Sequence, residues 1–379
     1  MVDIGSQTTT LALFTVADDR VRRDEQVRVP LPLVRHVLPD RGLSSEAVSE
    51  AARIVRKLGR HARRRGCSSV RCVATSAVRD AANAPDVLAE VAERAGVEPE
   101  LLDGRAEGEA AAVAVLRTLP VRDGAFFDLG GGSLQIGRLE GGRCATVESL
   151  PLGSLRLALS HLPDDPPGRA DLDALSAATE AALAPFAPLL ASTLLVGVGG
   201  TVRALAKVDR RAHGWPVAHS HGYWLSEEAL DDILRRLARR PARERSELGV
   251  PAHRVHSIVA GAVAVRGVLR MTAARGVRVC GFGLRDGVAY QTLDVPHPGR
   301  AHRDGPDWAV AAELVERADG RRATLRRLLR KPRPGWYQEE LIAAAAELGH
   351  EDAQAAVRAA SSAHGWERLP PAGARGGRS

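Results

Sequence analysis

Aromatic side chains are scarce in this sequence. They make up 3% of its 379 residues, although hydrophobic residues as a whole make up 45%. A large core can therefore be buried, but it must be built mainly from alanine, valine and leucine. No run of about 18 uninterrupted apolar residues occurs, which argues against a membrane-spanning helix. The N-terminus also lacks the charged and apolar regions of a signal peptide, so we expect no membrane partner.

Cysteine is rare as well. The four cysteines are widely separated and form no Cys-x-x-Cys pair, which argues against a zinc site and against a disulfide framework. A reducing cytoplasm is the simplest setting for such a chain, and we expect a cytoplasmic location. The four positions are Cys67, Cys72, Cys144 and Cys280.

Negative charge is in deficit, because 53 lysines and arginines face 46 acidic residues, a net charge of +7. Such a balance suits polyanionic partners, namely polyphosphate, nucleotides or nucleic acid. The positive charge is carried almost wholly by arginine, and alanine is also abundant. Both features are equally typical of a GC-rich genome, so charge by itself does not choose between these explanations.

One sequence pattern occurs twice, 125 residues apart (128 minus 3). Each copy reads as a strand, a glycine turn and a second strand, with an aspartate before the turn and a hydroxyl after it. A repeat at one domain length predicts a duplicated α/β domain. We expect one half over 1–120 and the other over 121–295. The two copies are Asp3-Ile-Gly-Ser-Gln-Thr-Thr-Thr-Leu11 and Asp128-Leu-Gly-Gly-Gly-Ser-Leu-Gln-Ile136.

Hydrophobic periodicity predicts the elements between and after these hairpins. The apolar run 27–38 contains two prolines, which favours an edge strand or a loop. Residues 296–379 read as a linker, a short helical extension and a disordered tail. Helices are expected from 44, over 84–95, 106–116, 171–190, 202–208, 226–239 and 254–274, and further strands over 69–75, 145–150, 193–198 and 277–280.

The two glycine turns carry the chemistry of the pattern. Glycines let backbone N–H groups converge on an anion, and Ser133 adds a hydroxyl donor. Asp128 and Asp3 are placed to hold a divalent cation, usually through water, that bridges to phosphate oxygens. A single turn of this kind is more often an ordinary glycine turn. Two copies favour a clamp that holds a phosphate chain from both sides, with Gly130, Gly131 and Gly132 in the central loop.

Two further segments are candidates for phosphate binding. Gly199, Gly200 and Thr201 follow a strand and open a helix, and a helix N-terminus attracts anions. A dinucleotide-binding fingerprint is rejected there, because its third glycine and its β-α-β context are missing. Arg79 lies on a strand-to-helix connection, from which it could bind phosphate through two hydrogen bonds. The alternative is that it decorates a surface turn.

Taken together, the ordered motifs resemble the exopolyphosphatase / guanosine pentaphosphate phosphohydrolase (Ppx/GppA) family over about residues 2–290. The resemblance implies the duplicated actin-like fold of the acetate kinase, sugar kinase, heat-shock chaperone and actin superfamily, which is ribonuclease H-like, with a cleft between the domains. The chain is similar to the short form of the family, without the extra helical domain. The motifs are Asp3-Ile-Gly-Ser, Ala74-Thr-Ser-Ala-Val-Arg-Asp-Ala-x-Asn83, Asp128-Leu-Gly-Gly-Gly-Ser133, Pro151-Leu-Gly-Ser-Leu-Arg156, Gly197-Val-Gly-Gly-Thr-Val-Arg-Ala-Leu-Ala206, Arg254 with Ala260-Gly-Ala262, and Gly283-Leu-Arg-Asp-Gly287.

The resemblance implies removal of the terminal phosphate from polyphosphate or guanosine pentaphosphate, usually with magnesium. Glu107 matches the family's catalytic glutamate, which would activate water for in-line attack on phosphorus. Without the resemblance, Glu107 and Glu109 read as acids that favour the first turn of a helix. A second copy of the chain is a candidate partner. The implied phosphate-binding residues are Ser6, Gln7, Thr8, Arg79, Gly130, Gly131, Gly132, Ser133, Gly199, Gly200, Thr201 and Arg254, and the implied metal ligands are Asp128 and Asp3.

Several positions depart from the family pattern. Gln7 and Thr8 replace its asparagine and serine, Leu134 and Gln135 replace a threonine and a glutamate, and His256 replaces an aspartate. These changes keep two alternatives open: a regulator that binds polyphosphate or guanosine alarmones without turnover, and an ATP phosphotransferase of the same superfamily. Nucleic-acid binding by the arginine-rich helix at 53–65 is a weaker option, because that helix lacks interleaved aromatic residues.

Overall fold

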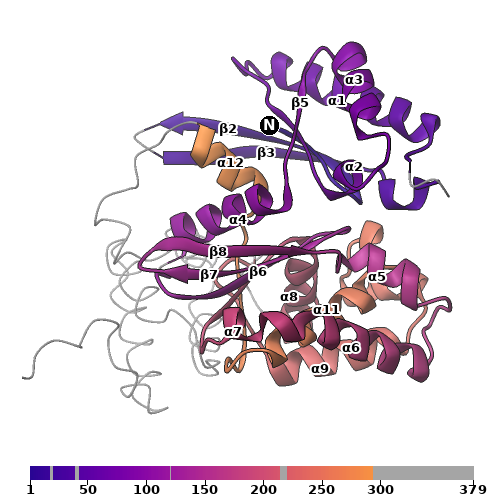
Figure 1. The fold of residues 1–379 in the computed structure, drawn as a ribbon, viewed down its shortest axis with the longest axis vertical. Helices are drawn as coiled ribbons and strands as arrows, with labels where there is room; N and C mark the ends of the chain where they lie inside the picture. The colour runs from indigo at the N-terminus through magenta and orange to yellow at the C-terminus, as the bar shows by residue number, and fades with distance from the viewer. Residues whose placement is uncertain (18–19, 39–41, 120, 214–219, 293–379) are drawn as a thin grey trace, which may run out of the picture.

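The structure, a computed structural model, describes residues 1–17, 20–38, 42–119, 121–213 and 220–292. Within these ranges the chain forms two halves, each built on one mixed β-sheet with helices packed against it (Figure 1). The linker, helical extension and tail expected over 296–379 lie outside the described residues.

The sheet of the first half has the strand order β3-β2-β1-β4-β5. Strand β2 pairs antiparallel with both β1 and β3, whereas β4 pairs parallel with both β1 and β5. Helix α1 packs against this sheet and against α3, and its apolar side is buried there. The bounds are β1 Val2–Ile4, β2 Thr8–Ala17, β3 Arg20–Pro30, α1 Ser45–Arg64, β4 Cys72–Ala74, α2 Ser76–Arg79, α3 Ala84–Ala95 and β5 Pro99–Leu101.

The sheet of the second half repeats this arrangement. Its order is β10-β11-β9-β6-β7-β8, so that β8, β7, β6, β9 and β11 correspond to β3, β2, β1, β4 and β5. The parallel and antiparallel pairings also correspond, and β10 is an addition at the edge. The duplicated α/β fold predicted from the repeat is therefore confirmed. The bounds are β6 Gly124–Leu129, β7 Leu134–Glu140, β8 Arg143–Leu150, β9 Leu195–Val198, β10 Trp224–Ser226 and β11 Gly276–Val279.

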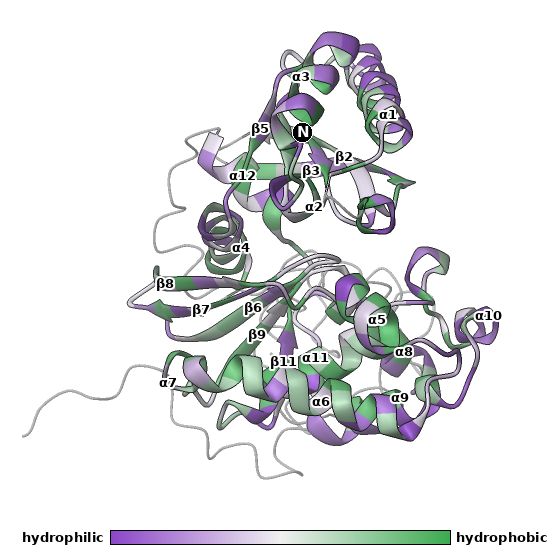
Figure 2. Cartoon of the chain, turned by 45° about the vertical axis from the view of Figure 1, so that its right-hand side comes forward, coloured by the Kyte–Doolittle hydropathy of each residue, from purple (hydrophilic) through white to green (hydrophobic). Residues whose placement is uncertain are grey.

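Helix α11 lies at the centre of the second half and is buried along most of its length. Figure 2 shows α11 as mostly hydrophobic, whereas the outer surface of α1 is hydrophilic. Aliphatic side chains dominate this core, as expected from the scarcity of aromatics. The helices of this half are α5 Ser154–His161, α6 Arg169–Leu183, α7 Ala187–Leu190, α8 Gly200–Ala212, α9 Glu227–Ala238, α10 Ala242–Arg245 and α11 Ile258–Arg270.

Helix boundaries follow local capping chemistry. Ser44 accepts a hydrogen bond from Ala47 N at the start of α1, and Ser226 does the same for α9. Gly96 ends α3 in the left-handed conformation, with φ of +65°. Prolines at 185 and 188 divide the single helix expected over 171–190 into α6, a 3-10 turn and α7.

Two helices lie between the sheets and join the halves (Figure 1). Helix α4, Gly104–Thr118, packs against β7 and β8, although it precedes them in the chain. Helix α12, Leu284–Thr292, returns from the second half to pack against α4 and β3. The two helices are in close contact, because a Cβ atom at Gly287 would overlap the carbonyl oxygen of Ala110.

The sequence located the long elements better than the short ones. The segment 27–38 includes the end of edge strand β3, as expected, followed by a 3-10 turn. Strands β5 and β10 and helices α5 and α12 were not predicted, because three to nine residues carry too little periodicity. None of the helices in the described ranges is long and apolar enough to cross a membrane.

Replacing Gly287 by alanine tests the contact between α12 and α4. We expect Gly287→Ala to lower the free energy of unfolding by about 2 kcal/mol, because one of the two backbones must move. Gly59→Ala in α1 is the matched control, since its Cβ would lie at ordinary contact distances, 3.7 Å and 3.8 Å, from its nearest neighbours. That variant should gain about 1 kcal/mol from helix propensity. Thermal unfolding of both variants checks the opposite signs, and equal shifts would contradict the close contact.

Candidate active site

A cavity of about 120 Å³ lies where the two halves meet. Both glycine hairpins, the start of α8, the first turn of α4 and the segment that opens α12 contribute to its wall. The structure thus brings together residues from the whole length of the described chain. The predicted residues that line it are Asp3, Ser6, Gln7, Thr8, Glu107, Asp128, Gly130, Gly131, Ser133, Gly199, Gly200 and Arg254.

The two glycine hairpins approach each other directly. A Cβ atom on Gly131 would lie 3.2 Å from Cβ of Gln7, and one on Gly132 would overlap the hydroxyls of Ser6 and Ser76. Those hydroxyls share a buried hydrogen bond of 2.7 Å. Backbone of one half therefore reaches side chains of the other because the loop carries no side chains of its own. The two hairpins therefore face each other, as a clamp would require.

The third glycine cluster contacts the same cavity. Gly199 precedes α8 with φ of +101°, in a region that favours glycine. The guanidinium of Arg254 lies over Gly200, where a Cβ atom would overlap it, and Arg254 Nη1 donates to Thr201 Oγ1 at 3.3 Å. Burial and the neighbouring arginines lower the pKa of Arg254 to about 9, which leaves it protonated at neutral pH.

Glu107 and Glu109 lie on the same helix but in different surroundings. The side chain of Asp103 caps α4 by accepting from Ala106 N at 2.7 Å, and Glu107 occupies the first turn. Glu107 is buried and pairs with Arg79. Glu109 is more exposed and pairs with Arg105 at 2.8 Å. A helix-dipole preference explains the position of both acids, but it does not explain why one of them is buried in the cavity wall.

Burial raises the pKa of all three carboxyl groups in the cavity. The pKa of Glu107 rises to about 7, a shift that Arg79 opposes and the nearby Asp128 and Asp3 increase. The pKa of Asp128 rises to about 6, again through burial, although Arg203 and Arg285 oppose it. Burial likewise raises the pKa of Asp3. Such shifts at one cavity are typical of catalytic and metal-binding sites.

The two aspartates have the chemistry of a magnesium site. Asp3 Oδ2 accepts from Arg285 Nη1 at 2.6 Å, while Asp3 Oδ1 is buried without a hydrogen-bond partner among the described residues. Magnesium is usually bound by one or two carboxylates, and water and substrate phosphate complete its coordination. The described residues contain no group of three or more His, Cys, Asp or Glu side chains that could hold a metal. Asp3 and Asp128 therefore fit a cation that depends on phosphate and water for its remaining ligands.

Three arginines that line the cavity were not predicted from the sequence as site residues. Arg203 lies in the first turn of α8, three residues after Gly200, and this spacing was a usable signal. Arg285 belongs to the motif Gly283-Leu-Arg-Asp-Gly287, for which the sequence predicted no function. Arg28 gave no local signal, because only the pairing of β3 with β2 brings it opposite Thr10. Together with Arg254 these side chains give four cations against three carboxyl groups.

Three predicted residues do not line the cavity, but each contacts a residue that does. Arg79 donates to Leu102 O at 3.0 Å and to Glu107, so its guanidinium is already occupied. Gly132 packs behind Ser6, and Thr201 accepts from Arg254.

The positions that depart from the family pattern fall in two places. Gln7 and Gln135 line the cavity, and Gln7 Nε2 donates across the halves to His253 O at 2.8 Å. Gln135 lies opposite Asp128 in the β6–β7 pair and donates to Ser133 Oγ at 2.9 Å. His256 is exposed and does not line the cavity.

Comparison with known proteins agrees with this geometry. A model of the Ppx/GppA phosphatase family matches residues 31–295. Exopolyphosphatase 1 of Mycobacterium bovis is 35% identical over 243 residues, which cover 62% of this chain and 70% of that protein. An uncharacterised protein of Streptomyces coelicolor is 30% identical over 337 residues, 84% of this chain and 94% of that protein.

Solved structures share the fold. An exopolyphosphatase from Cytophaga hutchinsonii has a TM-score of 0.72 and 23% identity, over 77% of this chain and 96% of that one. An Aquifex aeolicus member of the Ppx/GppA family has a TM-score of 0.67 and 24% identity, over the same shares. The fold is thus the duplicated actin-like one that the motifs implied. Because the family model spans well over half of the sequence, the chain belongs to the Ppx/GppA phosphatase family.

Proposed function

We propose that this protein hydrolyses the terminal phosphoanhydride bond of inorganic polyphosphate. The observation that carries the proposal is Glu107, a buried carboxyl group in the wall of a cavity that two glycine hairpins and four arginines also line. The curated Mycobacterium relative, named as an exopolyphosphatase, supports the same substrate. Hydrolysis needs a base for water and a cage for phosphate, and this cavity has candidates for both.

In the proposed reaction, Glu107 accepts a proton from a water molecule as its oxygen attacks the terminal phosphorus in line. The new O–P bond forms while the bridging P–O bond breaks. Inorganic phosphate and a chain shortened by one unit are the products. A base is most effective when its pKa lies near the working pH, and the pKa of Glu107, about 7, meets that condition. Arg79 acts as a positioning residue that holds the Glu107 carboxylate.

Developing charge on the phosphate would meet the arginines and the backbone N–H groups of the glycine loops. Asp3 and Asp128 would hold a magnesium ion, and a bound ion supplies further neutralisation of the phosphate oxygens. Arg285 shares the Asp3 carboxylate and thereby orients it. The proposed division of labour places metal binding at the two aspartates and proton transfer at Glu107.

Guanosine pentaphosphate is the second substrate that the family resemblance implies. No aromatic side chain occurs among the residues that line the cavity. A guanine base is commonly held by stacking on such a side chain, so the lining favours an unbranched phosphate chain. A regulator that binds without turnover remains the alternative, motivated by Gln7 and Gln135. An ATP phosphotransferase is the third option, and ATP-dependent transfer to an acceptor would identify it.

Replacing Glu107 by glutamine tests the proposed reaction. We expect Glu107→Gln to lower kcat for phosphate release from polyphosphate by about 10²- to 10⁴-fold, because the base is lost. Glu109→Gln removes an acid from the same helix and should stay close to wild type. The assay uses magnesium with polyphosphates of several lengths, guanosine pentaphosphate and ATP. Equal release by wild type and Glu107→Gln would refute the mechanism, and binding without any release by the wild type would favour the regulator.

The same substitution should stabilise the fold at alkaline pH. The pKa of Glu107 rises from its ordinary value of 4.5 to about 7 in the folded protein, so ionisation of Glu107 lowers the free energy of unfolding as the pH rises through this interval. The cost reaches at most about 3 kcal/mol above pH 7. We expect Glu107→Gln to have a higher free energy of unfolding than wild type at pH 8, and a smaller difference at pH 4.5. Urea unfolding at both pH values measures these free energies. A variant less stable than wild type at pH 8 would argue against a buried Glu107 carboxylate with a raised pKa.

Gln135 offers a test of the metal site. Gln135→Glu adds a carboxylate opposite Asp128, which should tighten magnesium binding on the order of tenfold. Gln291→Glu makes the same change of charge at an exposed position on α12 and serves as the control. Calorimetric titration with magnesium measures both affinities. If the two variants bind magnesium equally, the metal lies elsewhere.

A further inference from the structure

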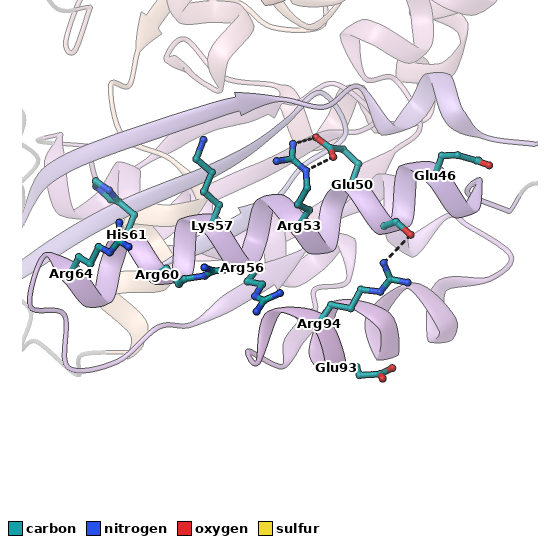
Figure 3. A pocket seen from close by; sticks show the side chains of 11 residues that line it. Glu46, Glu50, Arg53, Arg56, Lys57, Arg60, His61, Arg64, Glu93 and Arg94 are labelled. Atoms are coloured by element: carbon teal, nitrogen blue, oxygen red, sulfur yellow. Dashed lines mark hydrogen bonds and ion pairs between the residues drawn. The ribbon is translucent and has the colours of Figure 1, made fainter.

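A second, larger hollow lies on the outside of the first half, between α1 and α3. Its volume is about 860 Å³, and it shares no lining residue with the cavity at the hairpins. Figure 3 shows the charged side chains that surround it, most of them from α1. The lining residues are Glu46, Ser49, Glu50, Arg53, Arg56, Lys57, Arg60, His61, Arg64, Glu93 and Arg94, and we call this surface the α1 groove.

Positive charge is in excess in the α1 groove. Six lysine and arginine side chains face three glutamates in the lining. Arg53 is neutralised by Glu50 at 2.5 Å, and Arg94 by Glu90 at 3.1 Å. The remaining four cations have no ion-pair partner among the described residues, and all four are exposed. They are Arg56, Lys57, Arg60 and Arg64.

Three of these cations form a row along the helix. Arg56, Arg60 and Arg64 are spaced four residues apart, so they occupy one side of α1 over about 12 Å. Figure 3 shows Arg56 and Arg60 extending on the side of α3, whereas Lys57 extends away from it. Like charges at this spacing repel one another and oppose helix formation. A bound polyanion would relieve that repulsion.

The start of α1 is connected to the phosphate cavity. Leu31 N donates to Gln7 O at 3.1 Å, and Ser44 N, one residue before α1, donates to His36 O at 3.1 Å. The Asn83 side chain, one residue before α3, exchanges hydrogen bonds with the backbone of Leu43. Helix α1 therefore begins beside the elements that carry the cavity. Its basic row starts 11 residues after Ser45, about 16 Å further along the helix.

We propose that the α1 groove binds the distal part of a long inorganic polyphosphate chain whose terminal phosphate occupies the cavity. The proposal rests on the proposed function for the position of that terminus. The groove lining contains no phenylalanine, tyrosine or tryptophan, so among its residues only His61 and the arginine guanidinium groups could stack on nucleic-acid bases. A flexible chain of phosphates requires only a row of cations. Short chains held wholly in the cavity would not reach the row.

The test compares two variants of equal net charge, of which only one lacks the row of arginines on α1. Arg56→Gln, Arg60→Gln and Arg64→Gln are combined in one variant. The control combines Arg169→Gln, Arg235→Gln and Arg239→Gln, three exposed arginines on or at the end of α6 and α9. Both are made in the Glu107→Gln background, so that binding of labelled long-chain polyphosphate is measured without turnover. Tripolyphosphate and a single-stranded oligonucleotide are the comparison ligands.

We expect the groove variant to bind long-chain polyphosphate roughly tenfold or more weakly than the control, with a salt dependence lowered by about 2 in slope. Tripolyphosphate should bind equally to both. With Glu107 intact, the groove variant should raise KM for long chains alone. Equal binding of long chains by the two variants would overturn the proposal. So would an oligonucleotide that depends on the groove as strongly as polyphosphate does.

The two proposals fail separately. If the protein with Glu107 intact releases no phosphate from any chain length, the hydrolytic function is refuted, while the binding comparison still decides the groove. If phosphate is released and KM for long chains is the same in both variants, the hydrolytic function stands and the groove proposal falls.

Discussion

The close approach of backbones at the centre of the molecule constrains everything around it. Gly131 and Gly132 lie against the first hairpin. In turn, a Cβ atom on Gly153 would overlap the backbone of Gly131 and Gly132. Three layers of chain thus meet where side chains are missing. Backbone N–H groups can then face a common cavity, and no single half of the molecule could create this geometry.

Charge follows from this constraint. The meeting point is buried, so Glu107, Asp128 and Asp3 are held away from water and their pKa values rise. The arginines around them would be equally costly if buried alone, and burial lowers the pKa of Arg203 to about 10. Opposite charges compensate each other only in part. A polyanion with its metal ion would supply the remaining compensation, which agrees with a site adapted to phosphate.

The sequence predicted much of this arrangement, and its limits are physical. The pattern that begins at Asp3 and recurs at Asp128 located both hairpins, because each copy lies within a few consecutive residues. Glu107 was chosen over Glu109 only through a resemblance, since both acids suit a first helical turn. Arg28 was invisible, because its place depends on strand register over 18 residues (28 minus 10). Helix α12, nine residues long, gave too weak a pattern for its return to the first half to be foreseen.

That return has a consequence for how the molecule is made. Asp3 is held by Arg285, and Arg23 by Asp286 at 3.0 Å, across most of the chain. A ribosome releases the first hairpin long before it has synthesised α12. The nascent first half therefore carries an aspartate whose arginine partner does not yet exist. Assembly of the site must therefore wait until residues 284–292 have been synthesised, so a truncated product ending before α12 would contain both glycine hairpins and still lack a complete cavity.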